Sequence, residues 1–291
     1  MGEIKAVEPI LQVENLTHTY SAGTPFERSA ICGLNLTVYP GEFVGIIGRT
    51  GSGKSTLLQH LNGLLKPTAG CVKVAGRDIH EKSRDKVCYT VGLVFQYPEY
   101  QLFAETVAQD IAFGPRNMGL SAPEVERRVH EAADFVGLAP EMLEKSPFEL
   151  SGGEKRRVAI AGVLAMEPRV LILDEPTAGL DPHGRDVILD LLQSYHDKGG
   201  TVIMVSHAMD EVACLCGRVV VLGEGRVALD GTPRDIFRHA GQLIRLGLDV
   251  PEATKIAHAL KKRGLPIDDS VYTVADLAAE ILRARGGGAP C

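Results

Sequence analysis

A phosphate-binding pattern occupies eight consecutive residues, Gly48-Arg49-Thr50-Gly51-Ser52-Gly53-Lys54-Ser55. Glycines at these positions let backbone N–H groups approach phosphate oxygens, and the lysine reaches the terminal phosphates of a nucleotide. The hydroxyl of Ser55 is suited to Mg²⁺. A glycine-rich turn without a ligand is the alternative, but the complete pattern between a strand and a helix favours nucleotide binding.

Two adjacent carboxylates, Asp174 and Glu175, follow the apolar run 170–173. Next to a triphosphate, the aspartate is suited to Mg²⁺, directly or through water, and the glutamate is suited to activating the attacking water. Helix capping before Pro176 is the structural alternative. The phosphate loop upstream favours the chemical interpretation, which makes Asp174 a metal-binding residue and Glu175 a catalytic one.

A second glycine-flanked helix start is predicted at Ser151-Gly152-Gly153-Glu154. A serine followed three residues later by a glutamate fits a capping box, and we expect it to open a helix over 155–166. The same helix N-terminus offers free N–H groups and a positive dipole to a phosphate. Because the chain already has a phosphate helix after Gly53, this one is most useful if it points at a nucleotide held by another subunit.

Three further side chains are predicted at the site because of where they lie in the sequence. Gln96 ends a predicted strand and is placed to touch Mg²⁺ or the attacking water, and His207 follows an apolar run and is placed to steady the terminal phosphate. Alone, each would be an ordinary surface or core residue. Tyr20 suits stacking on adenine, with core packing as the alternative. The predicted nucleotide-binding residues are Tyr20, Gly48, Arg49, Thr50, Gly51, Ser52, Gly53, Lys54, Ser55, Thr56, Ser151, Gly152 and Gly153; the predicted metal-binding residues are Ser55, Gln96 and Asp174; the predicted catalytic residues are Glu175 and His207.

Strands of a parallel sheet must position these groups. The apolar run 43–47, the glycine loop and a helix over 54–65 form a strand, loop and helix in sequence, with Pro67 ending the helix. The runs 170–173 and 202–205 are apolar on both faces, as central parallel strands are. Ligands of open parallel sheets lie beyond the carboxyl ends of the strands, so the polar residues that follow these strands should converge in one crevice.

The remaining segments fit around this core. Residues 11–38 alternate apolar and polar around a loop at 21–25, which predicts antiparallel strands. A helical insertion is expected over about 97–165. We therefore predict an α/β fold with a nucleotide-binding domain over 1–238 and a C-terminal helical segment over 239–291, which either pairs two such chains or caps its own domain.

The composition limits the classes of function. A 291-residue chain with 45% apolar residues is long enough for a large buried core, and a formal net charge of −6 argues against a nucleic-acid-binding surface. Six scattered cysteines and an N-terminus without an apolar signal segment suggest a reducing cytoplasm. No run of eighteen apolar residues is present, so any membrane role must depend on a partner.

In these motifs and their order the chain resembles the ATP-binding cassette ATPases, over about residues 10–238. The resemblance makes 48–55 the Walker A loop, Ser151 to Glu154 the signature, Asp174 and Glu175 the Walker B end, and 179–182 the D-loop. Glu154 stands where many signatures have glutamine. The resemblance implies a P-loop NTPase fold with a RecA-like parallel core, an antiparallel β subdomain, ATP and Mg²⁺ as ligands, and ATP hydrolysis.

Within that family, residues 96–103 and 113–117 resemble the energy-coupling factor transporter ATPases. The insert after Tyr20 and the Pro-Glu-Tyr segment resemble the second, A-prime ATPase of that group. This implies a pair with a second, related ATPase, a transmembrane coupling protein and a substrate-capturing membrane subunit, and no nucleic-acid partner. It also implies a place on the cytoplasmic side of the cell membrane and uptake of a vitamin or a transition-metal ion.

Two alternatives remain at this point. The ATPase of another importer subfamily would have much the same motifs. A soluble cassette ATPase acting on DNA or ribosomes fits less well, because the chain passes from Lys54 to Ser151 without sustained heptads and carries a single cassette. Residues 97–103 are expected either to receive a helix of the membrane partner or to pack within the insertion.

Overall fold

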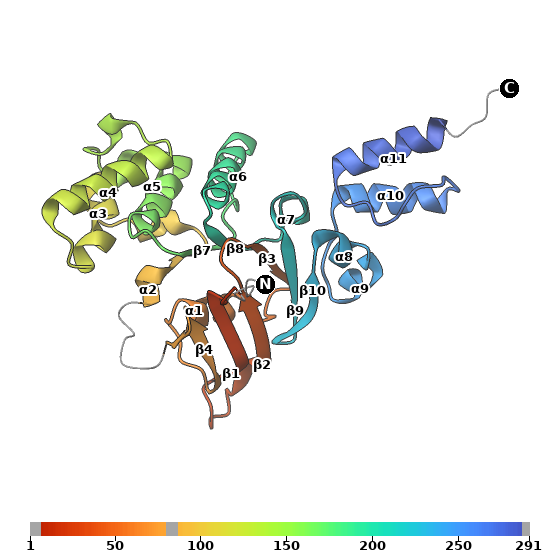
Figure 1. Cartoon of the computed structure of the whole chain (residues 1–291), viewed down its shortest axis with the longest axis horizontal. Helices are drawn as coiled ribbons and strands as arrows, with labels where there is room; N and C mark the ends of the chain where they lie inside the picture. The colour runs from red at the N-terminus through yellow and green to blue at the C-terminus, as the bar shows by residue number, and fades with distance from the viewer. Residues whose placement is uncertain (1–6, 80–86, 287–291) are drawn as a thin grey trace, which may run out of the picture.

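A six-stranded sheet forms the centre of the molecule (Figure 1). The structure is a computed structural model that describes residues 7–79 and 87–286. Five strands are parallel, and the edge strand β10 runs antiparallel to β9. The order across the sheet is β10 (Arg226–Gly231), β9 (Arg218–Gly223), β3 (Phe43–Gly48), β8 (Thr201–Val205), β7 (Val170–Asp174) and β6 (Val91–Val94).

Both faces of this sheet are covered, which explains the uninterrupted apolar runs. Every residue of β3 and β8 is buried. Along β3, Phe43 and Ile47 pack into a core shared with the helices, whereas Val44 and Ile46 pack into a core shared with a second sheet. Alternate side chains point to opposite faces of a strand, so a strand buried on both faces carries no polar alternation. The predicted parallel core is confirmed.

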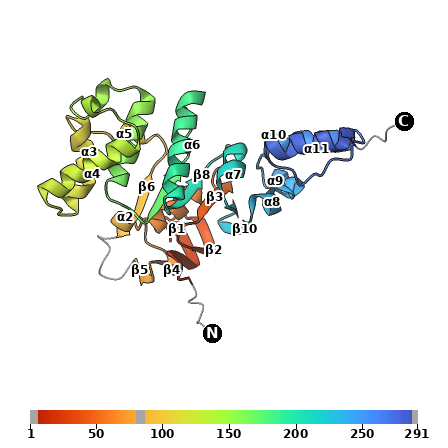
Figure 2. The ribbon, with the colours of Figure 1, turned by 45° about the horizontal axis from the view of Figure 1, so that its top comes forward.

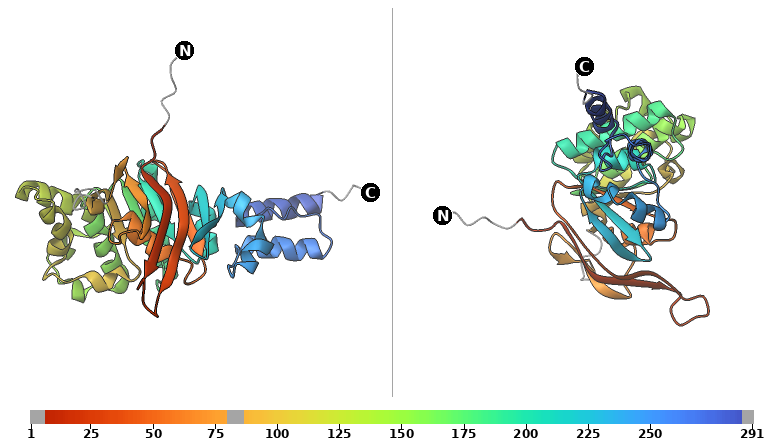
Figure 3. Two further views of the ribbon diagram at one scale, coloured as in Figure 1. Left: turned by 90° about the horizontal axis from the view of Figure 1, so that it is seen from below. Right: turned by 90° about the vertical axis from the view of Figure 1, so that its right-hand side faces the viewer.

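The second sheet is antiparallel and has the order β2-β1-β4-β5. Along β1 (Leu11–Tyr20), buried and more exposed residues alternate for much of the strand, as expected where one face meets the core. The predicted pairing of β1 with β2 (Arg28–Val38) is confirmed, and Figure 3 shows the two long strands side by side. The remaining strands are β4 (Ala69–Val74) and β5 (Arg77–Asp78).

Helix α1 (Lys54–Leu61) is shorter than predicted. The expected end at residue 65 is wrong because Gly63 adopts a left-handed conformation, with φ of +80°. Its N–H donates to His60 O over 3.1 Å, and the N–H of Leu64 donates to Gln59 O over 2.8 Å. This pair of bonds is the Schellman arrangement that ends helices at glycine. The chain therefore turns before Pro67 acts on it.

The helical insertion lies beside the β6 edge of the sheet (Figures 1 and 2). The predicted helix over 155–166 is α5, which begins three residues earlier because Ser151 caps it and both halves of the capping box are present. It ends two residues earlier than predicted. The elements of the insertion are η2 (Pro98–Gln101), α3 (Val107–Asn117), α4 (Ala122–Phe135), η3 (Pro140–Met142), η4 (Pro147–Glu149) and α5 (Gly152–Leu164).

The helices of the C-terminal segment extend from the opposite side of the sheet (Figure 1). The segment has a small core of its own, built from Ala253, Ala257, Ile267, Val271 and Leu277. Two large apolar residues of the segment are exposed, Ile244 by 61% and Leu282 by 68%. The other helices of the described residues are α2 (Val87–Thr90), α6 (Pro182–Asp197), α7 (Met209–Leu215), α8 (Pro233–Phe237), α9 (Ala240–Arg245), α10 (Glu252–Lys262) and α11 (Val274–Gly286).

The approach of α5 to β6 gives a test of the fold. A Cβ atom added at Gly92 would lie 2.5 Å from Cγ1 of Val163 and 3.1 Å from Cγ of Pro168. We expect Gly92→Ala to destabilise the protein by about 1–3 kcal/mol, because overpacking forces neighbouring groups to move. The matched control is Gly217→Ala, whose Cβ would meet none of the described residues within 4 Å. Equal urea midpoints for the two variants would contradict this packing.

Candidate nucleotide site

The phosphate loop connects β3 to α1. Gly53, the residue before α1, has φ of +101°, and a Cβ there would lie 2.6 Å from Ala30 O in β2. A side chain would therefore be both strained and too close to a neighbouring backbone. The N–H of Ser52 donates to Arg49 O over 3.1 Å, which closes the turn. These constraints hold the loop N–H groups around one concave space.

The ammonium group of Lys54 lies back against the loop that carries it. Its Nζ donates to the carbonyl of Gly48 and, over 3.3 Å, to the carbonyl of Arg49. Burial lowers the pKa of Lys54, and the nearby carboxylates of Glu175 and Asp174 oppose that effect. A partly desolvated cation beside backbone donors is suited to a polyphosphate, whose negative charge compensates the desolvation.

Asp174 and Ser55 lie together at the end of β7. The hydroxyl of Ser55 donates to Oδ2 of Asp174 over 3.0 Å. Burial raises the pKa of Asp174, whereas the hydrogen bond from Ser55 and the charge of Lys54 lower it. The described residues contain no group of three His, Cys, Asp or Glu side chains that could hold a metal by itself. The hydroxyl and carboxylate oxygens instead fit a Mg²⁺ ion that takes most of its ligands from phosphates and water.

Glu175 has an unusual backbone and an unpaired oxygen. Its φ of +52° is rare for a residue with a side chain, and such strain clusters at functional sites. Its Oε2 accepts the N–H of His207 over 3.3 Å. Its Oε1 is buried and has no hydrogen-bond partner among the described residues. Burial raises the pKa of Glu175, which makes its carboxylate a stronger base for a water molecule.

The imidazole of His207 is close to the same carboxylate. Its Nε2 lies 3.4 Å from Oε1 of Glu175. Burial, followed by the charge of Lys54, lowers the pKa of His207 below its ordinary value. The ring is therefore neutral near pH 7, and the contact with Glu175 is not an ion pair at that pH. A neutral imidazole can still donate one hydrogen bond to a phosphate oxygen.

One cavity of about 510 Å³ brings most of the predicted residues together. Gln96, Asp174, Glu175 and His207 all line it, as the shared carboxyl edge of the sheet predicts. Tyr20 is 39% exposed and lines the cavity, which favours ligand contact over core packing. The described residues that line it are Tyr20, Arg28, Ala30, Thr50, Gly51, Gly53, Lys54, Ser55, Thr56, Gln96, Asp174, Glu175 and His207.

Some predicted residues lie outside this lining. Ser52 is a buried residue within the loop, and Gly48 ends β3. Arg49 lines a neighbouring cavity that it shares with His207 and Gly247. The segment from Ser151 to Gly153 contributes nothing to the nucleotide cavity within its own chain.

Sequence reasoning missed Arg28. It pairs with Tyr20 in the register of β1 and β2, and both side chains line the cavity. Among the described residues Arg28 has no ion-pair partner, and one of its Nη atoms would lie 3.2 Å from a Cβ at Gly51. A free guanidinium beside a phosphate loop is suited to an anion. The available signal was its position three residues after the loop at 21–25.

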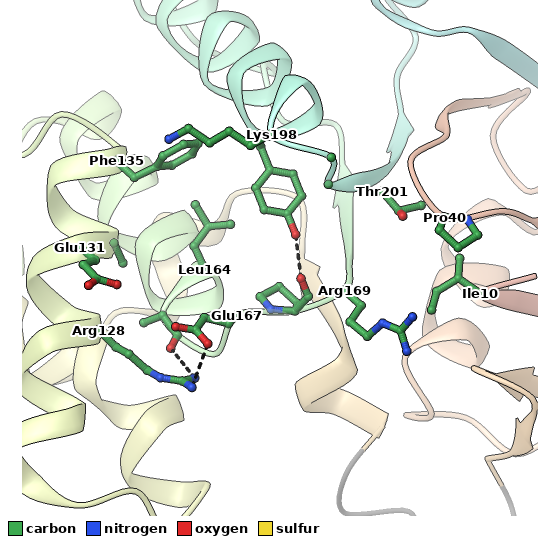
Figure 4. A pocket seen from close by; sticks show the side chains of 16 residues that line it. Ile10, Pro40, Arg128, Glu131, Phe135, Leu164, Glu167, Arg169, Lys198 and Thr201 are labelled. Atoms are coloured by element: carbon green, nitrogen blue, oxygen red, sulfur yellow. Dashed lines mark hydrogen bonds and ion pairs between the residues drawn. The ribbon is translucent and has the colours of Figure 1, made fainter.

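A larger cavity, of about 600 Å³, lies between the helical insertion and the start of the core strands (Figure 4). None of the predicted nucleotide, metal or catalytic residues lines it. Arg128 pairs there with Glu167 over 2.9 Å, and the hydroxyl of Tyr195 donates to Pro168 O over 2.8 Å. These polar groups are already paired, so the size of this cavity does not make it the site of chemistry.

Comparisons with known proteins identify the family of the chain. The ABC transporter family profile matches residues 31–178. The energy-coupling factor transporter ATP-binding protein EcfA2 of Caldanaerobacter subterraneus is 53% identical over 280 residues, which are 95% of this chain and 98% of that protein. The protein of the same name from Symbiobacterium thermophilum is 56% identical over 276 residues, 94% of this chain and 96% of that one.

Solved structures give the same result. The structure of cbiO1 from Clostridium perfringens, part of the ABC transporter complex cbiONQ, has a TM-score of 0.73 and 41% identity, and covers 87% of this chain and 99% of that one. The dimeric post-hydrolysis structure of the ATP-binding cassette MJ0796, bound to ADP and Pi, has a TM-score of 0.67 and 29% identity, and covers 77% of this chain and 98% of that one.

A parallel sheet with a phosphate loop, paired carboxylates and a histidine at one edge defines an ATP-binding cassette ATPase, and the profile match agrees. The chain belongs to the energy-coupling factor transporter ATP-binding proteins of the ABC transporter family. It is an ATPase whose hydrolysis of ATP is coupled to transport, and the resemblance seen in its sequence is confirmed. Within the described residues, no helix is long and apolar enough to cross a membrane.

The position of Lys54 predicts its contribution to binding. We expect Lys54→Ala to weaken ATP binding by about 10- to 100-fold, because a hydrogen bond to a charged group contributes about 1.5–3 kcal/mol. Isothermal titration calorimetry would measure the change. Lys66→Ala is the matched control, since Lys66 is exposed and does not line the cavity. Unchanged ATP affinity in Lys54→Ala would remove this residue from phosphate binding.

Proposed function

We propose that this chain pairs with a second, related ATPase, and that the two chains clamp ATP between them to power a membrane importer. The pair would work on the cytoplasmic side of the cell membrane with a transmembrane coupling protein and a substrate-capturing subunit. The transported solute would be a vitamin or a transition-metal ion. The observation that carries the proposal is the separation of the nucleotide cavity from the exposed tip of α5.

The tip of α5 is built to contact something outside its own chain. The first turn of the helix is capped through Ser151, whose N–H and hydroxyl both donate to Glu154 over 2.8 and 2.7 Å. A Cβ on Gly152 or Gly153 would meet nothing within 4 Å in the described part of the chain, and neither residue has a positive φ. The fold of this chain therefore gives no reason for two glycines. Close approach of a phosphate held by the partner ATPase supplies one.

The roles within the cavity follow from its geometry. Glu175 offers an unpaired, partly desolvated carboxylate oxygen to the attacking water, and His207 lies beside it to hold the terminal phosphate. Ser55, Asp174 and Gln96 would hold Mg²⁺, which neutralises phosphate charge when it is bound. Loss of the terminal phosphate would remove the contacts that hold the two chains together.

Replacing Glu175 tests the proposed base. We expect Glu175→Gln to reduce kcat for ATP hydrolysis by about 10²- to 10⁴-fold while ATP still binds, because the amide cannot accept the proton of water. The assay uses the assembled transporter in membranes, together with a direct measurement of ATP affinity. Glu224→Gln serves as the control, since Glu224 lies outside the cavity lining. Near-normal turnover in Glu175→Gln would rule out this role.

An aromatic surface after Gln96 supports docking of the membrane partner. Tyr100 is 84% exposed, and its ring centroid lies 6.2 Å from that of Tyr97. The exposed rings of Phe103 and Phe113 make an edge-to-face pair at 5.0 Å. Leu102, by contrast, packs partly against the core. Large exposed rings that remain unused inside the insertion are suited to receiving an apolar helix.

This surface predicts a selective effect on assembly. We expect Tyr100→Asp to prevent co-purification of the membrane subunits, because a charge placed in an apolar contact is costly to desolvate. Binding of ATP to the isolated chain should be unchanged. Phe26→Asp is the matched control, since Phe26 is equally exposed at 84% but lies in the β1–β2 loop. Intact assembly and transport in Tyr100→Asp would discard this docking surface.

We assign pairing of the two ATPases in part to the C-terminal segment, over 239–291. Ile244, Val274 and Leu282 are large apolar residues exposed on its helices. An extension with its own small core and an apolar outer surface is suited to contact between subunits. This segment, which follows the nucleotide-binding domain at residue 238, would keep the two ATPases together between rounds of ATP binding.

A further inference from the structure

We propose that Arg156 is a positioning residue that ties the segment after Gln96 to the loop after Glu175, so that the two move as one unit. The proposal rests on the proposed function insofar as Tyr100 contacts the membrane partner. Arg156 lies in α5, five residues after Ser151, and is only 1% exposed. It shares the apolar face of the helix with Ile160 and Leu164.

The guanidinium of Arg156 contacts two separate segments of the chain. Its Nη1 donates to Pro176 O over 2.9 Å and to Ala178 O over 2.8 Å. Its Nε and Nη2 donate to the carboxylate of Glu99 over 3.2 to 3.3 Å. These five contacts equal the number of N–H donors that an arginine has. The planar group therefore fixes both segments relative to α5.

The two segments belong to different parts of the proposed mechanism. Glu99 lies in η2, between Gln96 of the nucleotide cavity and Tyr100 of the docking surface. Pro176 and Ala178 directly follow Glu175, and the N–H of Ala178 donates to Glu175 O over 3.2 Å. Arg156 therefore contacts both η2, which leads to the proposed docking surface, and the turn that follows the carboxylate of Glu175.

The physical properties of this contact favour joint motion. The side chains of Arg156 and Glu99 are 2% and 18% exposed, so separating them would leave a charge with little access to water. The backbone also comes close across the same junction, since a Cβ added at Gly179 would lie 3.7 Å from the ring of Tyr97. A shift of η2 caused by the partner is then less costly if the loop at 176–178 follows it.

The neighbouring arginine provides a matched control. Arg157 donates to Gly137 O over 2.6 Å and to Val136 O over 3.3 Å, all within the helical insertion. Arg157 has no contact with η2 or with the loop at 176–178 among its hydrogen bonds in the described chain. Arg157→Lys keeps the positive charge and removes similar hydrogen bonds from the same helix without touching the proposed tie.

The test compares Glu99→Gln, Arg156→Lys and Arg157→Lys in the complete transporter, reconstituted in vesicles. Uptake of solute and hydrolysis of ATP are measured in the same preparation, and kcat and KM for ATP are obtained separately. We expect the first two variants to lower the uptake per ATP hydrolysed by about 5-fold or more with KM unchanged, whereas Arg157→Lys leaves the ratio unaltered. A purely structural role would change assembly or KM but not this ratio.

Three outcomes would overturn the proposal. In the first, Glu99→Gln and Arg156→Lys transport as much solute per ATP as the unmodified transporter. In the second, this ratio falls equally in Arg157→Lys. In the third, Glu99→Gln and Arg156→Lys fail to assemble while Arg157→Lys assembles, which would give Arg156 a purely structural role. The docking surface is judged separately, by assembly of Tyr100→Asp. If that variant assembles normally but the uptake ratio still falls in Glu99→Gln and Arg156→Lys, the tie is retained and only the docking surface is lost.

Discussion

The nucleotide cavity depends on a balance of charges that are partly removed from water. Lys54, Asp174 and Glu175 meet at the carboxyl edge of the sheet, where burial lowers the pKa of the lysine and raises the pKa of both acids. Each group alone would tend to lose its charge there. Together, and with Arg28 at the rim, they make a site where phosphate charge completes the balance. The strands, the phosphate loop and helix α1 hold these groups within one cavity.

The sequence predicts those parts of the site in which a short pattern determines the local structure. The phosphate loop, the paired carboxylates and His207 each follow an apolar run, and parallel strands bring their ends to one edge. The capping box at Ser151 is equally local, since both partners lie within one helical turn. For these elements the chemistry and the backbone conformation are encoded by the same few residues.

Other features depend on contacts between distant segments. Arg156 and Glu99 pair across 57 positions, and nothing near either residue indicates the partner. A basic residue on the apolar stripe of Ile160 and Leu164 was a signal that such a pair exists, but not of its identity. Arg28 is likewise placed at the cavity by the strand register that pairs it with Tyr20, which its local sequence does not indicate. The predicted end of α1 was wrong because the prediction relied on Pro67 as the stop signal, whereas the left-handed Gly63 ends the helix earlier.

One contact links the catalytic edge to the C-terminal helices. The N–H of Glu252, the first residue of α10, donates to Oδ1 of Asp210 in α7 over 3.1 Å, and Asp210 lies three residues after His207. The first turn of a helix has few other acceptors for its N–H groups. A rotation of α10 that left α7 in place would break this hydrogen bond, so the position of the C-terminal helices is tied to the helix that follows His207.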